Sequence, residues 1–217
     1  MERGRKMKIA LFGATGMIGK RILTEALERG HEVTAIVRDR ARLGVQHERL
    51  AVVTGDIFHT ERVTEVVRGH EVVISAFGPK MGEEQTLLEA TQSLIAGVKK
   101  AGVSRLIAVG GAGSLEVAKG VQLVDTSEFP DFIKPIALAH REALEMYRQE
   151  KELDWTNVSP AALIEPGERT GTYRIGTDQL VVNEQGESRI SVEDYAVAIL
   201  DEVENPRFSR MRFTVGY

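Results

Sequence analysis

The sequence predicts an α/β fold in which a doubly wound parallel sheet lies between two layers of helices. Three observations predict it: short β-branched apolar runs alternate with helical patterns, glycines follow most of these helical patterns, and a glycine-rich turn directly follows the first apolar run. Strands that are apolar along their whole length are typical of a parallel sheet covered on both faces. We therefore expect three layers, with a small C-terminal lobe added to them.

The first βαβ unit is the clearest part of the pattern. Residues 8–12 form an apolar run that stops at a glycine, and apolar residues then recur at helical spacing over 18–27. Gly30 follows as a C-terminal cap, and 31–37 form a β-branched run. A strand, a glycine turn, a helix, a cap and a second strand in this order predict a right-handed crossover.

The rest of the chain repeats this pattern more loosely. We expect further strands at 50–54, 72–75, 105–109 and 155–159, and helices at 61–68, 83–101 and 133–149. After Thr172 the runs shorten, and we expect strands at 180–183, 188–191 and 212–215 and a helix at 192–203. The polar, basic residues 1–6 are left out of the fold prediction. The sequence thus predicts one domain over 1–217, with a core at 7–160 and a lobe at 161–217 over the cleft.

Composition excludes several classes of protein. The 217 residues include 28 Lys and Arg against 32 Asp and Glu, a net charge of −4, which is too balanced for a nucleic-acid binder. The absence of cysteine excludes disulfides, thiolate metal sites and a cysteine nucleophile. The five histidines show no paired spacing typical of zinc, so we expect no metal.

The hydropathy pattern favours a cytoplasmic protein. No apolar run reaches the ~18–20 residues that span a bilayer, and no charged-then-apolar leader is present. We expect no membrane partner and no nucleic-acid partner. We also expect a monomer or a weak homodimer that acts on a small molecule.

The glycine turn after the first strand predicts a phosphate site. Gly13 permits a tight turn, Gly16 lets backbone amides approach a ligand, and Gly19 lets the helix pack on the strand. The helix start presents N–H groups and a partial positive charge, which suit a diphosphate. The spacing differs from the standard dinucleotide fingerprint, but the complete βαβ context favours a dinucleotide over a merely tight turn.

The end of the second strand favours NADP over NAD. NAD-binding proteins place a carboxylate there, whereas this strand is followed by Arg38, whose guanidinium suits a phosphate. Asp39 leaves NAD open as an alternative, and Arg42 is a second candidate for the phosphate. Asp56, after the third strand, is either an acceptor for an adenine amino group or a turn residue. Residues 76–78 follow the fourth strand, where the small residues Ala76 and Gly78 allow the backbone to approach a ligand closely.

The motifs together resemble the atypical short-chain dehydrogenase/reductases. The segments that carry the resemblance are 13–19, 37–39, 55–57, 153–160 and 190–196. Within that superfamily the chain is most similar to the NADH-flavin reductase group, akin to biliverdin reductase B, and more distantly to NmrA-like proteins. The resemblance implies a Rossmann-type fold that holds NADP(H). The residues it implies at the cofactor are Gly13, Thr15, Gly16, Met17, Ile18, Arg38, Asp56, Ile57, Ala76, Phe77, Gly78, Gly110, Gly111, Pro160 and Ala161.

The catalytic residues are harder to predict. Tyr147 and Lys151 match the Tyr-x-x-x-Lys pair of the superfamily, but they fall in the last turn of the predicted helix, away from the expected ligand edge. His140 lies nearer the expected place and is the candidate catalytic residue, able to supply a proton near neutral pH. The alternative is a hydrogen-bonded core histidine.

The resemblance also shows departures. The serine and histidine of the biliverdin reductase B pattern are replaced by Gly110-Gly111-Ala112 and Pro160-Ala161-Ala162, which puts biliverdin reduction in doubt. Ser114 is either a partial substitute or a turn residue. Without a placed acid, a flavin or quinone-like acceptor fits better than a ketone, because solvent can protonate the reduced ring.

We therefore expect an oxidoreductase that passes hydride from NADPH to a flavin-like or quinone-like acceptor, with the flavin as substrate and not tightly bound. The alternative is a protein that senses NADP(H) without turnover, as in the NmrA-like type. Residues 113–132 are expected to form a loop over the substrate, or else a plain surface loop.

Overall fold

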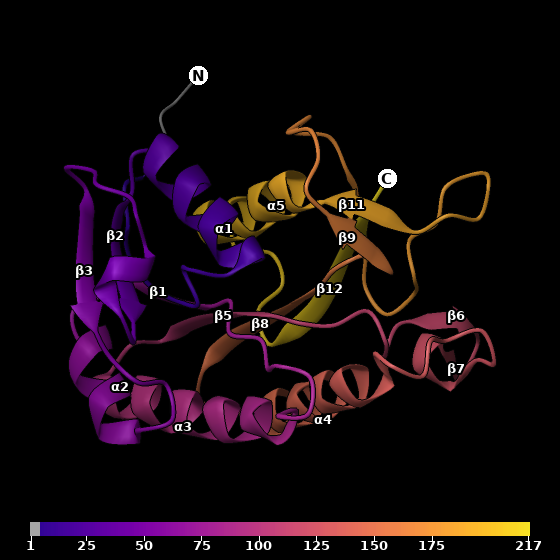
Figure 1. Cartoon of the computed structure of the whole chain (residues 1–217), viewed down its shortest axis with the longest axis horizontal. Coiled ribbons are helices and arrows are strands. Elements are labelled where there is room, and N and C mark those ends of the chain that lie inside the picture. Colours follow the sequence, from indigo (N-terminus) through magenta and orange to yellow (C-terminus); the bar gives the residue numbers. More distant parts are fainter. Residues whose placement is uncertain (1–4) are drawn as a thin grey trace.

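An eight-stranded sheet forms the middle layer of the computed structural model, which describes residues 5–217 (Figure 1). Only residues 5–6 of the leader set aside above are described, and 1–4 lie outside. In spatial order the strands are β3 (Leu50–Thr54), β2 (Glu32–Val37), β1 (Lys8–Phe12), β4 (Val72–Ser75), β5 (Arg105–Val109), β8 (Asp154–Ser159), β12 (Met211–Gly216) and β10 (Arg174–Gly176). All neighbours pair in parallel except β10 and β12.

Helices cover both faces of this sheet (Figure 1). One layer holds α1 (Met17–Glu28) and α5 (Val192–Glu204), and the other holds α2 (Thr60–Val67), α3 (Gln85–Ala101) and α4 (Lys134–Gln149). Two apolar cores result, one on each face of the sheet. This confirms the predicted α/β fold with three layers.

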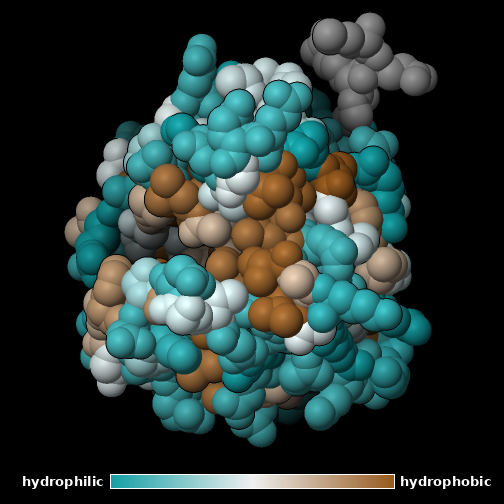
Figure 2. Space-filling model, turned by 90° about the vertical axis from the view of Figure 1, so that its right-hand side faces the viewer, coloured by the Kyte–Doolittle hydropathy of each residue, from teal (hydrophilic) through white to brown (hydrophobic). Residues whose placement is uncertain are grey.

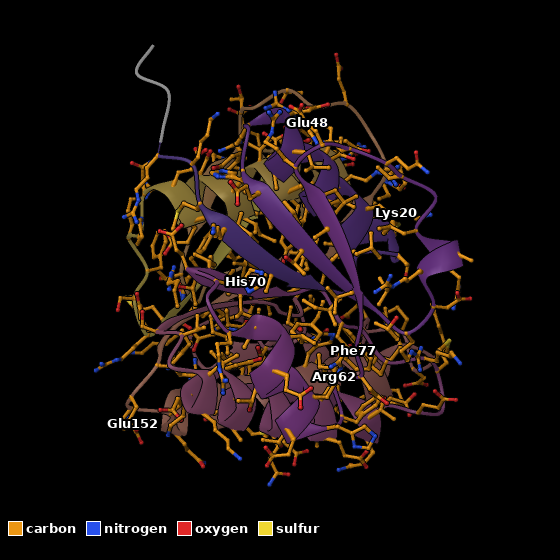
Figure 3. The ribbon with its side chains drawn as sticks, turned by 90° about the vertical axis from the view of Figure 1, so that its left-hand side faces the viewer. Lys20, Glu48, Arg62, His70, Phe77 and Glu152 are labelled. Carbon is orange, nitrogen blue, oxygen red and sulfur yellow. The ribbon has the colours of Figure 1, made fainter. Side chains whose placement is uncertain are left out.

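The strand order places a crevice between β1 and β4. The chain winds outward from β1 through β2 to β3, then crosses back to β4 and continues to β5 and β8. At such a point, loops leave the carboxyl ends of two neighbouring strands in opposite directions, and open α/β sheets bind ligands there. In Figure 3, Phe77 lies beyond the arrowheads of β2 and β3, whereas Glu48 lies where β3 begins.

The segment expected as a C-terminal lobe is divided in the structure. Strand β12 extends the main sheet beside β8, and α5 packs against α1 in one helical layer. Only the remainder, with the short strands β9 (Leu163–Glu165) and β11 (Arg189–Ser191), stays outside the main sheet. Residues 161–217 therefore do not form a separate lobe over the cleft: β12 and α5 belong to the three-layer core, and only the rest of the segment lies outside it.

The expected strand at 180–183 is wrong. The backbone there forms isolated hydrogen bonds and no strand: the Leu180 N–H donates to the carbonyl of Glu116, and the Asn183 N–H donates to the carbonyl of Glu187. The edge strand of the sheet is instead β10, ahead of this stretch. Residues 113–132 also hold more structure than a loop, namely β6 (Glu116–Ala118), β7 (Val121–Gln122) and a 3-10 turn, η2 (Leu123–Asp125).

Within residues 5–217, no helix combines the length and the apolar character that a bilayer crossing requires.

Candidate functional site

The three glycines after β1 serve different purposes. Gly13 has a φ of +79°, and a Cβ there would lie 2.4 Å from the carbonyl oxygen of Ala76. A Cβ on Gly19 would lie 2.0 Å from the carbonyl oxygen of Gly13. A Cβ on Gly16 would approach protein atoms no closer than 3.4 Å. The fold therefore requires the first and third glycines, while the second leaves open space at the start of α1.

The start of α1 is available to an anion. Gly16 is the N-cap residue, no side chain caps the helix, and its first turn holds no acidic residue. Unpaired N–H groups at a helix N-terminus and the helix dipole favour a negatively charged group there. The glycine turn thus has both the space and the donors for a diphosphate.

A cleft of about 180 Å³ opens at this point, and we call it the glycine-loop cleft. Its lining residues are Phe12, Gly13, Thr15, Gly16, Ile36, Val37, Arg38, Gly55, Ile57, Phe58, Ala76, Phe77 and Gly78. The carboxyl ends of β1, β2, β3 and β4 thus meet around one space. Phe58 and Phe77 pack edge to face with their ring centroids 5.5 Å apart.

The polar groups at the ends of β2 and β3 differ in what they bind. Arg38 lines the cleft and is exposed, and within residues 5–217 no hydrogen bond or ion pair engages its guanidinium. Asp39 instead caps the 3-10 turn η1 (Arg40–Arg42), where its Oδ1 accepts from the Ala41 N–H at 3.0 Å. Arg40 donates to Thr54 Oγ1. Of these side chains, Arg38 is the one placed to meet a phosphate in the cleft.

Two sequence-predicted residues fall outside the cleft linings. The Oδ1 of Asp56 accepts from the Phe58 N–H at 3.1 Å, and its Oδ2 lies 3.7 Å from Nε2 of His59, so the carboxylate stabilises its own turn and does not line the cleft. The Met17 side chain starts α1, is 45% exposed and lines neither cleft. A short carboxylate two residues before a free N–H favours that local bond, which is the turn role that the sequence left open for Asp56.

A larger cleft of about 450 Å³ continues from the first along the carboxyl edge, and we call it the apolar cleft. The two share Ala76, Phe77 and Gly78. The apolar cleft is lined from the sheet side by Ile18, Val109, Gly110, Gly111, Ala112, Gly113, Pro160, Ala161, Ala162 and Ile164. Its other wall comes from η2, the following segment and α4, with Leu123, Thr126, Glu128, Phe129, Pro130, Phe132, Ile133, Ile136, Ala137 and His140.

Apolar side chains also remain on the surface near this wall. Phe132 is 70% exposed and Ile133 is 40% exposed. Figure 2 shows a band of hydrophobic side chains beside a hollow on the side of the molecule that carries β6, β7, β9 and β11. The segment 126–133 therefore supplies a wall of the apolar cleft, as expected for part of 113–132. The β6 and β7 residues do not line it.

The glycines after β5 fix the position of His140. A Cβ on Gly111 would lie 2.8 Å from the Cβ of His140, and a Cβ on Gly110 would lie 2.2 Å from Oδ1 of Asn157. Small residues at the end of β5 thus let α4 approach the sheet edge. His140 reaches the wall of the apolar cleft for this reason.

His140 is a neutral imidazole at the cleft wall. It stays partly exposed, and within residues 5–217 no hydrogen bond to its ring is present. Burial of the ring among apolar groups lowers the pKa of His140 to about 4. The expected role as a proton donor near neutral pH is therefore corrected: the ring offers an N–H or a lone pair, but it carries no charge at pH 7.

Acidification is expected to destabilise the protein through His140. The unfolded chain binds a proton on this ring near pH 6.5, whereas the folded chain resists it down to about pH 4, so stability falls as the pH drops through that window. We expect a contribution of about 1–3 kcal/mol, reduced from the full linkage value because the ring is partly exposed. The free energy of unfolding in urea, measured between pH 7 and 4.5, checks this.

The matched variant is His140→Gln. Burial also lowers the pKa of His31, so both proteins lose stability in acid, and only the difference between their curves reports His140. That difference should grow in favour of the glutamine variant as the pH falls. Parallel curves would contradict the assignment of a neutral ring whose pKa is lowered in the folded chain.

Tyr147 and Lys151 lie apart from both clefts. Tyr147 is buried, with its ring centroid 6.0 Å from that of Trp155, and this burial raises the pKa of its hydroxyl. It lines a small cavity of about 10 Å³ behind His140. Lys151 is exposed and donates through Nζ to the carbonyl of Arg148. Ser114 is also buried and accepts from Arg212 at 2.8 Å, so it has a structural role.

The structure adds residues that the sequence did not single out. Ile36, Phe58, Ile133 and Ile136 line the clefts without a recognisable motif, whereas the wall residues from Leu123 to Phe132 lie in the segment 113–132 that was expected near the substrate. The only signal for the wall was its place after the fifth strand, at the edge where such sheets bind ligands. Across residues 5–217, no three His, Asp or Glu side chains come together as a metal site.

Comparisons with known proteins agree with the fold and identify the family. A family model described as NAD(P)H-binding matches residues 13–203. "Uncharacterized protein YwnB" of Bacillus subtilis (strain 168) is 45% identical over 212 residues, which cover 96% of this chain and 98% of that protein.

Two solved structures extend the comparison. One, named a "putative epimerase" from Bacteroides thetaiotaomicron, is 46% identical, with 98% of each chain covered and a TM-score of 0.93. Another, named a "putative NADH-flavin reductase" from Streptococcus pneumoniae TIGR4, is 35% identical, with 97% of this chain and 99% of that chain covered and a TM-score of 0.87. The resemblance predicted from the sequence is confirmed, while the names of these relatives differ in the reaction they give.

Proposed function

The chain belongs to the NAD(P)H-binding family, and from this premise we propose that it is an oxidoreductase that uses NADPH in preference to NADH to reduce a flat ring acceptor of the flavin or quinone type. The observation that carries the proposal is the space at Gly16. The protein leaves this position open to a Cβ, yet a glycine stands there, at the uncapped start of α1. Internal packing does not require a glycine at position 16, but a ligand phosphate that lies against the backbone would require one.

The residues of the glycine-loop cleft fit a dinucleotide. The first-turn amides of α1 would hold the diphosphate, and Ile36, Ile57 and Phe58 offer apolar contact to an adenine ring. Arg38 stands free at the end of β2, where a 2′-phosphate would lie, while Asp39 is engaged in its own cap. A guanidinium with no internal partner favours the phosphorylated form of the cofactor.

The apolar cleft then positions an acceptor beside the cofactor. When bound, NADPH would supply hydride. The chain supplies two largely apolar walls, from the residues after β5 and from the segment 126–133, that would orient a ring. His140 offers a hydrogen bond from a neutral ring. Tyr147 lies behind His140 and Lys151 binds Arg148, so neither is placed to protonate a substrate alkoxide.

This arrangement favours acceptors whose reduced form takes its proton from solvent. Flavins and quinones delocalise the added charge over a ring, whereas a ketone needs an acid at the oxygen. We therefore expect steady NADPH oxidation with riboflavin, FMN or a soluble quinone and little with simple ketones. The loss of NADPH absorbance, at cofactor concentrations that saturate binding, measures it.

A pair of variants separates the cleft from the rest of the fold. Ala162→Trp places a bulky ring in the apolar cleft, whereas Ala118→Trp places the same ring on exposed β6 outside it. Turnover should be lost in the first variant and kept in the second. Saturable NADPH binding with no turnover of any acceptor would contradict the proposed enzymatic activity and favour the alternative, a protein that senses NADP(H).

A further inference from the structure

The apolar cleft carries charge of one sign only, which is negative. Among its lining residues the only charged side chain is that of Glu128, and neither lysine nor arginine is present. The polar lining groups besides it are Thr126 and the neutral ring of His140. The cleft therefore has no cation that would hold a phosphate or a carboxylate on a bound molecule.

Glu128 keeps its negative charge at this wall. It is exposed, its Oε1 accepts from the Ser127 hydroxyl at 2.8 Å, and this bond lowers the pKa of the carboxyl group. Within residues 5–217 no ion pair neutralises it. Asp125, nearby in the chain, is paired with Arg141 at 3.1 Å, while Asp131 adds a second negative charge and Lys134 a positive one at the start of α4.

The glycine-loop cleft has the opposite character. Arg38 and the amides of α1 are the groups there that would bind a phosphate, and Arg38 does not line the apolar cleft. The two clefts are joined only through the uncharged residues 76–78. Recognition of phosphate is thus confined to one end of the groove, and the other end repels it.

We infer, on the basis of the proposed function, that the acceptor presents an uncharged, unphosphorylated ring to the apolar cleft, and that Glu128 selects against acceptors that carry a phosphate or sulfonate. The class is neutral aromatic acceptors, such as riboflavin or an unsubstituted quinone. Their charged counterparts, FMN or a sulfonated quinone, have the same reacting ring and differ in the anionic group alone. Like charges at an exposed rim weaken association modestly and in a salt-dependent way.

Riboflavin and FMN test this directly, because the two differ only by the phosphate. At low ionic strength we expect a kcat/KM for riboflavin about three- to tenfold above that for FMN, in keeping with the size of exposed charge interactions. Glu128→Gln should narrow the ratio and Glu128→Lys should reverse it. Glu184→Gln, a change of the same kind on an exposed turn away from the cleft, should leave the ratio unchanged.

Binding provides a readout that does not need turnover. With NADP⁺ at saturation to fill the glycine-loop cleft, quenching of flavin fluorescence should give the same order of affinities and the same response to the Glu128 variants. An absence of turnover with this order intact would contradict the proposed reaction but support the inference about charge. The inference would be overturned if FMN bound as tightly as riboflavin, or if Glu128→Lys left the ratio of the two affinities unchanged.

Discussion

Replacing Arg38 with aspartate is expected to weaken NADPH binding by one to two orders of magnitude, or about 1.5–3 kcal/mol, the size of a charge-assisted hydrogen bond. NADH binding should stay near its wild-type value, so the preference for NADPH shrinks or reverses. The reason is that the Arg38 guanidinium lines the glycine-loop cleft with no partner of its own, whereas an aspartate there repels a phosphate and can accept from a ribose hydroxyl. Parallel calorimetric titrations with NADPH and NADH measure both affinities.

Arg42→Asp is the matched control for this change. Arg42 is also an exposed arginine, in the turn η1 just beyond β2, but it does not line the cleft. The same change of charge outside the cleft should alter NADPH affinity only slightly, and this effect should decrease as the salt concentration rises. Equal losses in the two variants would mean that general charge, and not a contact with Arg38, sets the preference.

The second large effect is expected at the glycine turn, where two alanine variants should fail in different ways. Gly16→Ala should fold with nearly wild-type stability but lose most dinucleotide affinity, because its Cβ meets no protein atom closer than 3.4 Å and occupies the space over the α1 amides. Gly13→Ala should instead unfold more easily, by about 2–4 kcal/mol, since the residue has a φ of +79° and its Cβ would lie 2.4 Å from the Ala76 carbonyl oxygen.

Urea unfolding and NADPH titration of both variants separate these two outcomes. The wild-type chain serves as the reference for each measurement. A Gly16→Ala protein that binds NADPH normally would remove the assignment of the diphosphate to this helix start. A Gly13→Ala protein as stable as the wild type would show that the β1–α1 turn tolerates another conformation.

Much of the fold could be predicted because local patterns and tertiary packing agree there. The runs at 8–12, 50–54, 72–75 and 105–109 match β1, β3, β4 and β5 to the residue, since each is an apolar run bounded by a turn, although β3 is an edge strand and stays partly exposed. Gly102 has a φ of +76° and ends α3 as a left-handed cap. The part of the candidate site that follows the strand ends could be predicted too, because the glycine turns there can be recognised in the sequence.

The other features depend on contacts that no local pattern records. The apolar run 180–183 was predicted as a strand, but its backbone bonds to Glu116 at the start of β6 and to Glu187 further along the same loop. The sequence left Asp56 open as a ligand contact or a turn residue, and only the folded backbone shows that its Oδ1 accepts from the nearby Phe58 N–H. The neutral state of His140 and the wall from 126 to 133 follow from how α4 meets the sheet edge, which is set by tertiary packing.

A crystal structure of the protein grown with excess NADPH tests the central claim most directly. We expect the diphosphate against the first-turn amides of α1, the 2′-phosphate beside Arg38, and the nicotinamide ring toward the glycines after β5. A cofactor bound elsewhere on the molecule, or an empty glycine-loop cleft at saturating NADPH, would contradict it.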